Sequence, residues 1–353
     1  MSRRSRARIA TAAMAGVVVL GLVACSGEQP ASDPSGQTGP PPPAEANTKT
    51  APPTADSAQA AADWLKDNLT DGSHAELEYD GDMFADAGLT IDSMWALMAA
   101  GDTEAAQKAA DWLALRDTAI DYAGDGEQAA YPSAMGKLAL AYLTPGVTVS
   151  PEYKPADLAA SIAGRISPEG RFRDISEWGD NSTPAGQAFD IILLVQLGQL
   201  DGLTADPVAG LLAVGCEDGS YPSMFDTDPP CVGDVDTTAI VAQAMLAAGQ
   251  GEVAERAFDY LLTAQTESGR WQSFGVDSVN STALAVGALS LWDTPEAKDA
   301  AALGMEELAA WQLPKTAAFP AVAGGEGDLR ATAQGILGLK GVSYLDLLDI
   351  HPQ

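Results

Sequence analysis

Acidic residues stand just ahead of each strongly apolar segment of this chain, and they are the side chains best placed for chemistry. They are Asp86, Glu127, Asp180, Asp234, Asp236, Asp277 and Asp328. Carboxylates gathered at one end of a fold can hydrogen-bond amides or hydroxyls, or hold a cation. Each can equally cap the helix that follows, where its oxygen accepts hydrogen bonds from free backbone N–H groups. Both uses stay open from the sequence.

The segment Gly233–Gly249 shows what these acids precede. Between Ala239 and Ala248 the only polar residue is Gln243. A helix that is apolar on nearly every face has no solvent side, so other parts of the protein must surround it. Gly249 stands where glycine commonly ends a helix. We therefore expect a buried helix that begins beside Asp234 and Asp236.

Buried and amphipathic segments alternate from residue 57 onward. The buried segments open at Thr90, Ser133, Thr183, Thr238, Thr282 and Thr332, at intervals of 43 to 55 residues. The amphipathic segments span residues 57–69, 103–116, 153–166, 206–215, 252–265 and 296–312. Such intervals are typical of helical repeats, but an open solenoid exposes part of every helix. The pattern predicts an all-α fold, an (α/α)6 barrel with six inner and six outer helices.

The start of the chain has the features of a targeting signal. Residues 1–24 contain four arginines and no acid, and residues 9–24 are apolar. This stretch is shorter than a membrane span and is typical of a signal peptide. It ends in Leu22-Val23-Ala24-Cys25, which resembles the lipobox of bacterial lipoproteins; an ordinary signal peptide is the alternative. The resemblance implies cleavage before Cys25 and a lipid on its sulfur.

The domain prediction follows from that boundary. Residues 1–24 form the signal peptide, residues 25–56 the lipidated Cys25 with a disordered Pro-rich tether, and residues 57–353 the folded domain. The lipid would hold the domain on the extracytoplasmic face of a bacterial cell membrane, so the membrane is one expected partner.

Charge and cysteine content limit the possible functions. The formal net charge of −30 repels nucleic acid, which is not expected as a partner. In an exported chain Cys216 and Cys231 favour a disulfide; a thiolate metal pair is the alternative, but no histidine lies near. His74 and His351 do not stand beside a cysteine. We expect no metal and no cofactor.

Two motifs resemble one superfamily. Gln265 to Trp271 fits Q-x3-G-x-W, with weaker echoes at Gly170-Arg-Phe172 and Gly219-Ser-Tyr221. Residues 234–239, Asp-Val-Asp-Thr-Thr-Ala, resemble the element D-x-D-D-T-A. Over about residues 57–340 the chain is similar to the α/α-toroid superfamily of terpenoid cyclases and protein prenyltransferases, with squalene-cyclase-like repeats. Its nearest non-enzymatic relatives are the cobalamin carriers. The resemblance implies the toroid fold.

The resemblance also suggests a catalytic residue. In class II terpene cyclases the middle Asp of the element, here Asp236 beside Asp234, is the general acid. Thr237 replaces one carboxylate of that pattern. Three features argue against a cyclase. The chain supplies one barrel, whereas these cyclases usually enclose substrate between two, and its aromatic content of 6% is low for lining a carbocation pocket. The domain is also expected outside the cell, whereas polyprenyl substrates are made in the cytoplasm.

The sequence therefore favours binding over catalysis. The main hypothesis is a lipid-anchored binding protein and not an enzyme. It would capture a small ligand, such as a corrinoid-like one, or a protein partner of the envelope or a transporter. The expected ligand-binding residues are Asp180, Asp234, Asp236, Asp328, Trp178 and Phe225. The first alternative is a class II terpene cyclase-like enzyme with Asp236 as general acid. The second is a structural protein of the cell envelope.

Overall fold

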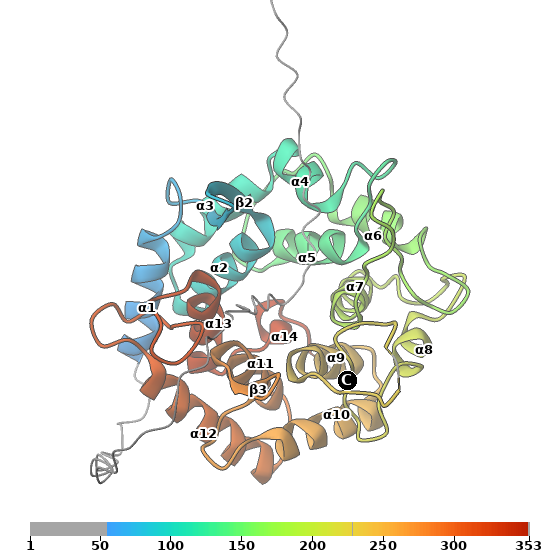
Figure 1. The fold of residues 1–353 in the computed structure, drawn as a ribbon. Helices are drawn as coiled ribbons and strands as arrows, with labels where there is room; N and C mark the ends of the chain where they lie inside the picture. The colour runs from blue at the N-terminus through green and yellow to red at the C-terminus, as the bar shows by residue number, and fades with distance from the viewer. Residues whose placement is uncertain (1–54, 228, 352–353) are drawn as a thin grey trace, which may run out of the picture.

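A computed structural model describes residues 55–351 except residue 228. Two concentric rows of helices form a closed ring (Figure 1). The inner helices are α2 (Ala87–Ala100), α5 (Pro132–Leu143), α7 (Pro184–Gln196), α9 (Val235–Ala247), α11 (Val279–Leu289) and α13 (Leu329–Lys340). The outer helices are α1 (Ala55–Asp67), α3 (Thr103–Leu113), α6 (Pro155–Ala163), α8 (Pro207–Leu212), α10 (Gly251–Ala264) and α12 (Pro295–Trp311). The predicted (α/α)6 barrel is confirmed.

The ring closes between its first and last repeats. Helix α13 packs against both α1 and α2. The side-chain amide of Gln312 donates to the carbonyls of Ser57, 2.8 Å away, and Ala317, 2.7 Å away. Gln265 makes the equivalent bridge to Gly269 and Ala300. Each amide thus ties a connector to the next outer helix, which is the physical role of the Gln in the Q-x3-G-x-W pattern.

A polar side chain four residues after the N-cap holds most inner helices against the connector before them. Thr90, Thr238, Thr282 and Thr332 each accept a hydrogen bond from a connector backbone N–H. In α7 this acceptor is Gln187, which bonds the N–H of Phe172 at 3.1 Å. The buried segment opens at Thr183 as expected, but Thr183 is the N-cap of α7 and not the fourth residue after it.

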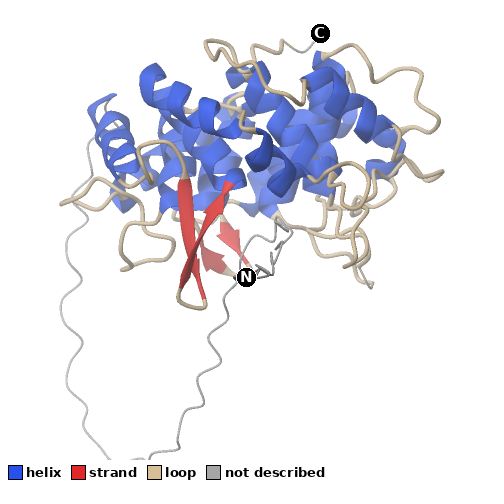
Figure 2. Ribbon diagram, turned by 90° about the horizontal axis from the view of Figure 1, so that it is seen from above, coloured by secondary structure: helices blue, strands red, loops and turns tan. Residues whose placement is uncertain are grey.

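The strands form two short hairpins at one end of the ring (Figure 2). They are β1 (Ala75–Tyr79) with β2 (Asp82–Asp86), and β3 (Gln272–Ser273) with β4 (Val276–Asp277). Each hairpin lies in a connector that leads into an inner helix. We call this end, where the six inner helices begin, the acidic end.

Two helices depart from the predicted alternation. The amphipathic segment 103–116 ends early, and a separate helix α4 (Arg116–Ala123) follows it. The short helix α14 (Tyr344–Leu347) lies near the centre of the ring (Figure 1). The backbone N–H of Tyr344 donates to Gln243 Oε1 at 2.8 Å, and Gln196 donates to the Leu348 carbonyl at 3.4 Å. Both glutamines lie late in their helices, so α14 closes the end opposite the acidic end.

The predicted disulfide is confirmed. Cys216 and Cys231 are bonded in the connector between α8 and α9, with Cα atoms 5.6 Å apart. The signal peptide, lipidation of Cys25 and most of the tether lie outside the described residues. Across residues 55–351 apart from 228, no helix combines the length and hydropathy needed to cross a membrane.

Candidate functional site

The side chains that face the ring axis follow from the register of the inner helices. The fourth residue after each N-cap points outward, to its connector. At about 100° per residue, the second and sixth residues point nearly opposite, toward the axis. The second positions hold Gly88, Ser133, Ala185, Asp236, Asn280 and Arg330. The sixth positions hold Asp92, Lys137, Phe189, Ile240, Leu284 and Gln334.

Asp236 differs from Asp234, Asp328 and Asp180 because it neither caps a helix nor pairs with a cation in the described part of the chain. Its side chain is buried, and Oδ1 has no hydrogen-bond partner there. Burial, followed by the negative charge of Asp234, raises the pKa of Asp236 from 3.8 to about 7. The Ser281 hydroxyl acts in the opposite direction on this pKa, although its geometry does not complete a hydrogen bond. Near neutral pH this carboxyl therefore keeps its proton in a large share of the molecules.

The neighbours of Asp236 are partly polar and partly apolar. Asn280 Oδ1 and Ser281 Oγ, both on the first turn of α11, are also buried without partners in the described residues. One helical turn deeper lie the buried side chains of Ile240 and Leu284. A substrate at this depth would meet hydrogen-bonding groups above and hydrocarbon below.

A charge network stands across the axis from Asp236. Asp92 Oδ1 lies 2.6 Å from Lys137 Nζ, and both side chains are at most 9% exposed. Arg330 reaches Asp92 Oδ2 at 3.5 Å and Asp86 Oδ2 at 3.2 Å. Two cations thus balance two carboxylates, which is the condition for keeping charges buried.

Aromatic rings form the floor of the site. Tyr344 packs against Phe189 and Trp95, with ring centroids 5.1 and 5.4 Å apart. The Lys137 ammonium lies 5.8 Å from the Trp95 ring and 5.9 Å from the Phe189 ring. Burial raises the pKa of Tyr344 well above its ordinary value, and the charges of Asp92 and Asp236 add to this. The phenol therefore sits within electrostatic reach of both carboxyls.

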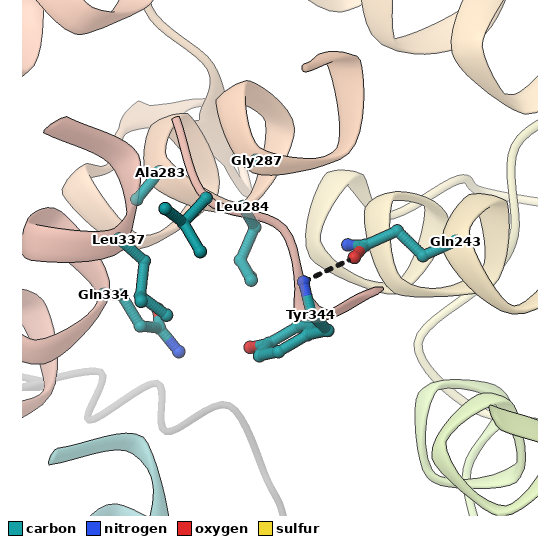
Figure 3. A pocket seen from close by; sticks show the side chains of 8 residues that line it. Gln243, Ala283, Leu284, Gly287, Gln334, Leu337 and Tyr344 are labelled. Carbon is teal, nitrogen blue, oxygen red and sulfur yellow. Dashed lines mark hydrogen bonds between the residues drawn. The ribbon is translucent and has the colours of Figure 1, made fainter. Parts of the chain in front are cut away.

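A small cavity adjoins this floor between α9, α11, α13 and α14 (Figure 3). Gln334 and Tyr344 extend their side chains toward each other across it, and Leu284 lies on its wall. It has room for about one water molecule. Gln334 Oε1 is buried with no partner among the described residues, so this space is polar on one side.

The four acids among the predicted ligand-binding residues divide into three groups. Asp234 and Asp328 are N-caps that accept from the N–H three residues on, at 2.8 and 2.7 Å. Asp180 pairs with Arg171 at 3.1 Å. For these acids the structural role, capping or pairing, is the one observed. Only Asp236 is free of such a role.

The two aromatic residues among the predicted ligand-binding residues lie in different environments. Trp178 is 67% exposed on the connector before α7. Phe225 is buried, and the Arg171 guanidinium lies 4.3 Å from its ring centroid. One face of Phe225 is therefore already covered by a cation.

A second fully buried acid lies between α5 and α7. Neither carboxyl oxygen of Asp190 has a partner in the described chain. Burial, then the charge of Asp174, raises the pKa of Asp190 well above its ordinary value. Gly136 makes room for it, because a Cβ there would meet Asp190 Oδ1 at 2.1 Å. This position faces the neighbouring helix and not the axis, so we assign it to packing.

Comparison with known proteins agrees with this geometry. The sequence matches no family model and no curated protein. Among solved structures, the type II terpene cyclase MstE from Scytonema superposes with a TM-score of 0.61 at 17% identity, covering 81% of this chain and 96% of that chain. The fold is that of the α/α-toroids.

Two carbohydrate-active toroids are similar to the same extent. The unsaturated glucuronyl hydrolase from Bacillus sp. GL1 gives a TM-score of 0.58 at 14% identity, covering 80% of this chain and 94% of that chain. An inactive variant of the α-1,6-mannanase GH76A of Salegentibacter sp. HEL1_6 gives a TM-score of 0.62 at 13% identity, covering 81% of this chain and 98% of that chain. At these identities the likeness shows the fold alone.

The comparison corrects the expectation that the chain binds a ligand without being an enzyme. The similar toroids named above are all enzymes. One argument against a cyclase also fails. Almost the whole of the solved cyclase superposes on this one ring, so a second barrel is not required for that activity.

Proposed function

We propose that this chain is an enzyme in which Asp236 donates a proton to a carbon–carbon double bond of an uncharged, isoprenoid-like substrate. The observation that carries the proposal is the buried, axis-facing carboxyl of Asp236, whose pKa is about 7. General acids work best when their pKa lies near the working pH. The substrate would enter at the acidic end and lie with its hydrocarbon against Ile240 and Leu284.

The floor of the site suits the charge that such a step creates. Protonation of an alkene leaves a carbocation, and aromatic faces attract cations. Trp95, Phe189 and Tyr344 are grouped below the acid, and two of these rings already accept the Lys137 ammonium at about 6 Å. A structure of a variant of the similar cyclase holds geranylgeranyl dihydroxybenzoate as substrate, and we propose a substrate of that chemical type here.

The test uses the purified chain in deuterated buffer with geranylgeranyl and farnesyl compounds. The carbocation is discharged by loss of a proton from another carbon, so the cyclised or isomerised product keeps the one deuterium added to the double bond, which mass spectrometry detects. Asp236→Asn should abolish turnover, while Asp234→Asn, which retains a capping side chain, should keep it. Unchanged turnover in the Asp236 variant would remove this proposal.

A second candidate is glycoside hydrolysis, favoured by one observation. Asp236 is buried without a cation, whereas Asp92 across the axis lies beside the Lys137 and Arg330 cations. Two carboxyl groups in such different surroundings are the usual equipment for cleaving a glycosidic bond. Release of reducing sugar from mannan or unsaturated glucuronides, with no reaction of isoprenoids, would favour this candidate over the first.

We also propose, from the sequence, that the enzyme is anchored to the extracytoplasmic face of the membrane by a lipid on Cys25. Labelling of the chain with radioactive palmitate in the producing cell, and loss of the label in Cys25→Ser, is the expected result. Release of an unlabelled chain into the medium by the natural sequence would contradict it.

A further inference from the structure

Exposed hydrophobic side chains gather on the connectors at the acidic end. In the described residues, every exposed large hydrophobic lies on a connector that leads into an inner helix, with the exceptions of Leu115, Leu212 and Leu303. Trp178, Phe274 and Tyr79 are each more than 60% exposed. Single exposed hydrophobics are ordinary, but a group confined to one end of a molecule marks a binding surface. We call this group the apolar rim.

The β1–β2 hairpin is the most prominent part of the apolar rim, and it projects from the ring (Figure 2). Its register pairs Leu77 with Phe84 and Tyr79 with Asp82. Directly paired residues lie on the same face of a hairpin, so Leu77, Phe84 and Tyr79 share one face. These three side chains are 40%, 43% and 61% exposed. An isolated hairpin is marginally stable, and contact with a partner would stabilise it.

Negative charge surrounds the same apolar side chains. The hairpin itself carries Glu76, Glu78, Asp80 and Asp82, and it contains no lysine or arginine. Anionic lipid headgroups would be repelled by these acids. A second copy of this chain would be repelled as well, because each copy carries a net charge of −30. The charge pattern selects a partner that is both cationic and apolar.

We propose that the apolar rim docks a polypeptide whose surface combines basic and apolar side chains. Its apolar groups cover Leu77, Phe84 and Tyr79, while its lysines and arginines lie against the flanking carboxylates. Such a partner would sit over the acidic end and control access to Asp236. The docking is independent of which substrate the site accepts, so it can be tested apart from the proposed reaction.

The test measures fluorescence anisotropy of two labelled probes, an amphipathic peptide of lysine and leucine and a matched peptide of glutamate and leucine, at 0.15 M salt. The full chain should bind the first probe and not the second. The triple variant Leu77→Ser, Tyr79→Ser, Phe84→Ser keeps every charge, so purely electrostatic attraction would survive in it. We expect at least a tenfold loss of affinity.

Matched controls separate docking from general damage. The double variant Leu115→Ser, Leu212→Ser removes exposed leucines elsewhere and should bind as the parent chain does. If the triple variant unfolds, Trp178→Ser with Phe274→Ser, on two other connectors, should weaken binding in the same direction. Equal binding by the triple variant would overturn the proposal. Two other results would also overturn it if the chain binds no peptide. One is binding to phosphatidylcholine vesicles that the triple variant loses, and the other is self-association that the triple variant loses.

Discussion

Replacing Asp236 by asparagine should make the protein more stable while removing its proposed proton donor. The pKa of Asp236 is about 7 in the folded chain, against an ordinary value of 3.8. Between these pH values the folded state holds a proton that the unfolded state has lost, so stability falls as pH rises. Over this pH range the free energy of unfolding of the parent falls by about 4 kcal/mol. Asparagine does not ionise, so this loss is absent in the variant. The free energy of unfolding of the variant should exceed that of the parent by up to about 4 kcal/mol at pH 8 and should match it near pH 4.

Urea unfolding followed by far-UV circular dichroism measures this directly, at intervals from pH 4 to pH 8. The quantity of interest is the difference between variant and parent, because other acids titrate in both. Asp328→Asn is the matched control, since it makes the same change at the N-cap of another inner helix. A difference between Asp236→Asn and the parent that stays constant with pH would refute the reasoning.

Three further outcomes are expected. Removing the charge of Asp234 with Asp234→Asn should lower the pKa of Asp236, so the alkaline fall in activity should move to lower pH, as a pH–rate profile would show. Lys137→Met leaves Asp92 buried with only Arg330 in reach, so the free energy of unfolding should fall by about 3–5 kcal/mol. Adding Asp92→Leu should recover part of this loss. No recovery in urea unfolding would contradict the pairing. Tyr344→Ala should destabilise by about 3–5 kcal/mol through loss of ring contacts, whereas Tyr344→Phe should unfold near the parent temperature in calorimetry.

The ring of helices could be predicted because it follows from the alternation of buried and amphipathic segments along the sequence. Segments such as Thr238–Ala248 have no polar face, so a second layer must cover them. Alternation with amphipathic segments then leaves a closed double ring as the simplest arrangement. The disulfide could be predicted too, since Cys216 and Cys231 share one short connector. The α14 helix could not, because four residues carry too little periodicity to place them on the axis.

Much of the site was missed for a related reason. The acids before the inner helices drew attention, yet capping occupies Asp234 and Asp328. The informative residues were single charges inside apolar segments, Asp92 and Lys137, which only a partner makes tolerable. Their partnership depends on the packing of α2 beside α5, which sequence spacing alone does not give.

The most direct test of this account is the protonation state of Asp236. Carbon-13 NMR of the protein labelled at its aspartate carboxyls, with Asp236→Asn to identify the resonance, follows this one group through a pH titration. The account predicts a midpoint near 7 in the folded chain. A midpoint near 4 would show a carboxylate that is already ionised at neutral pH, and the proposed proton donor would be lost with it.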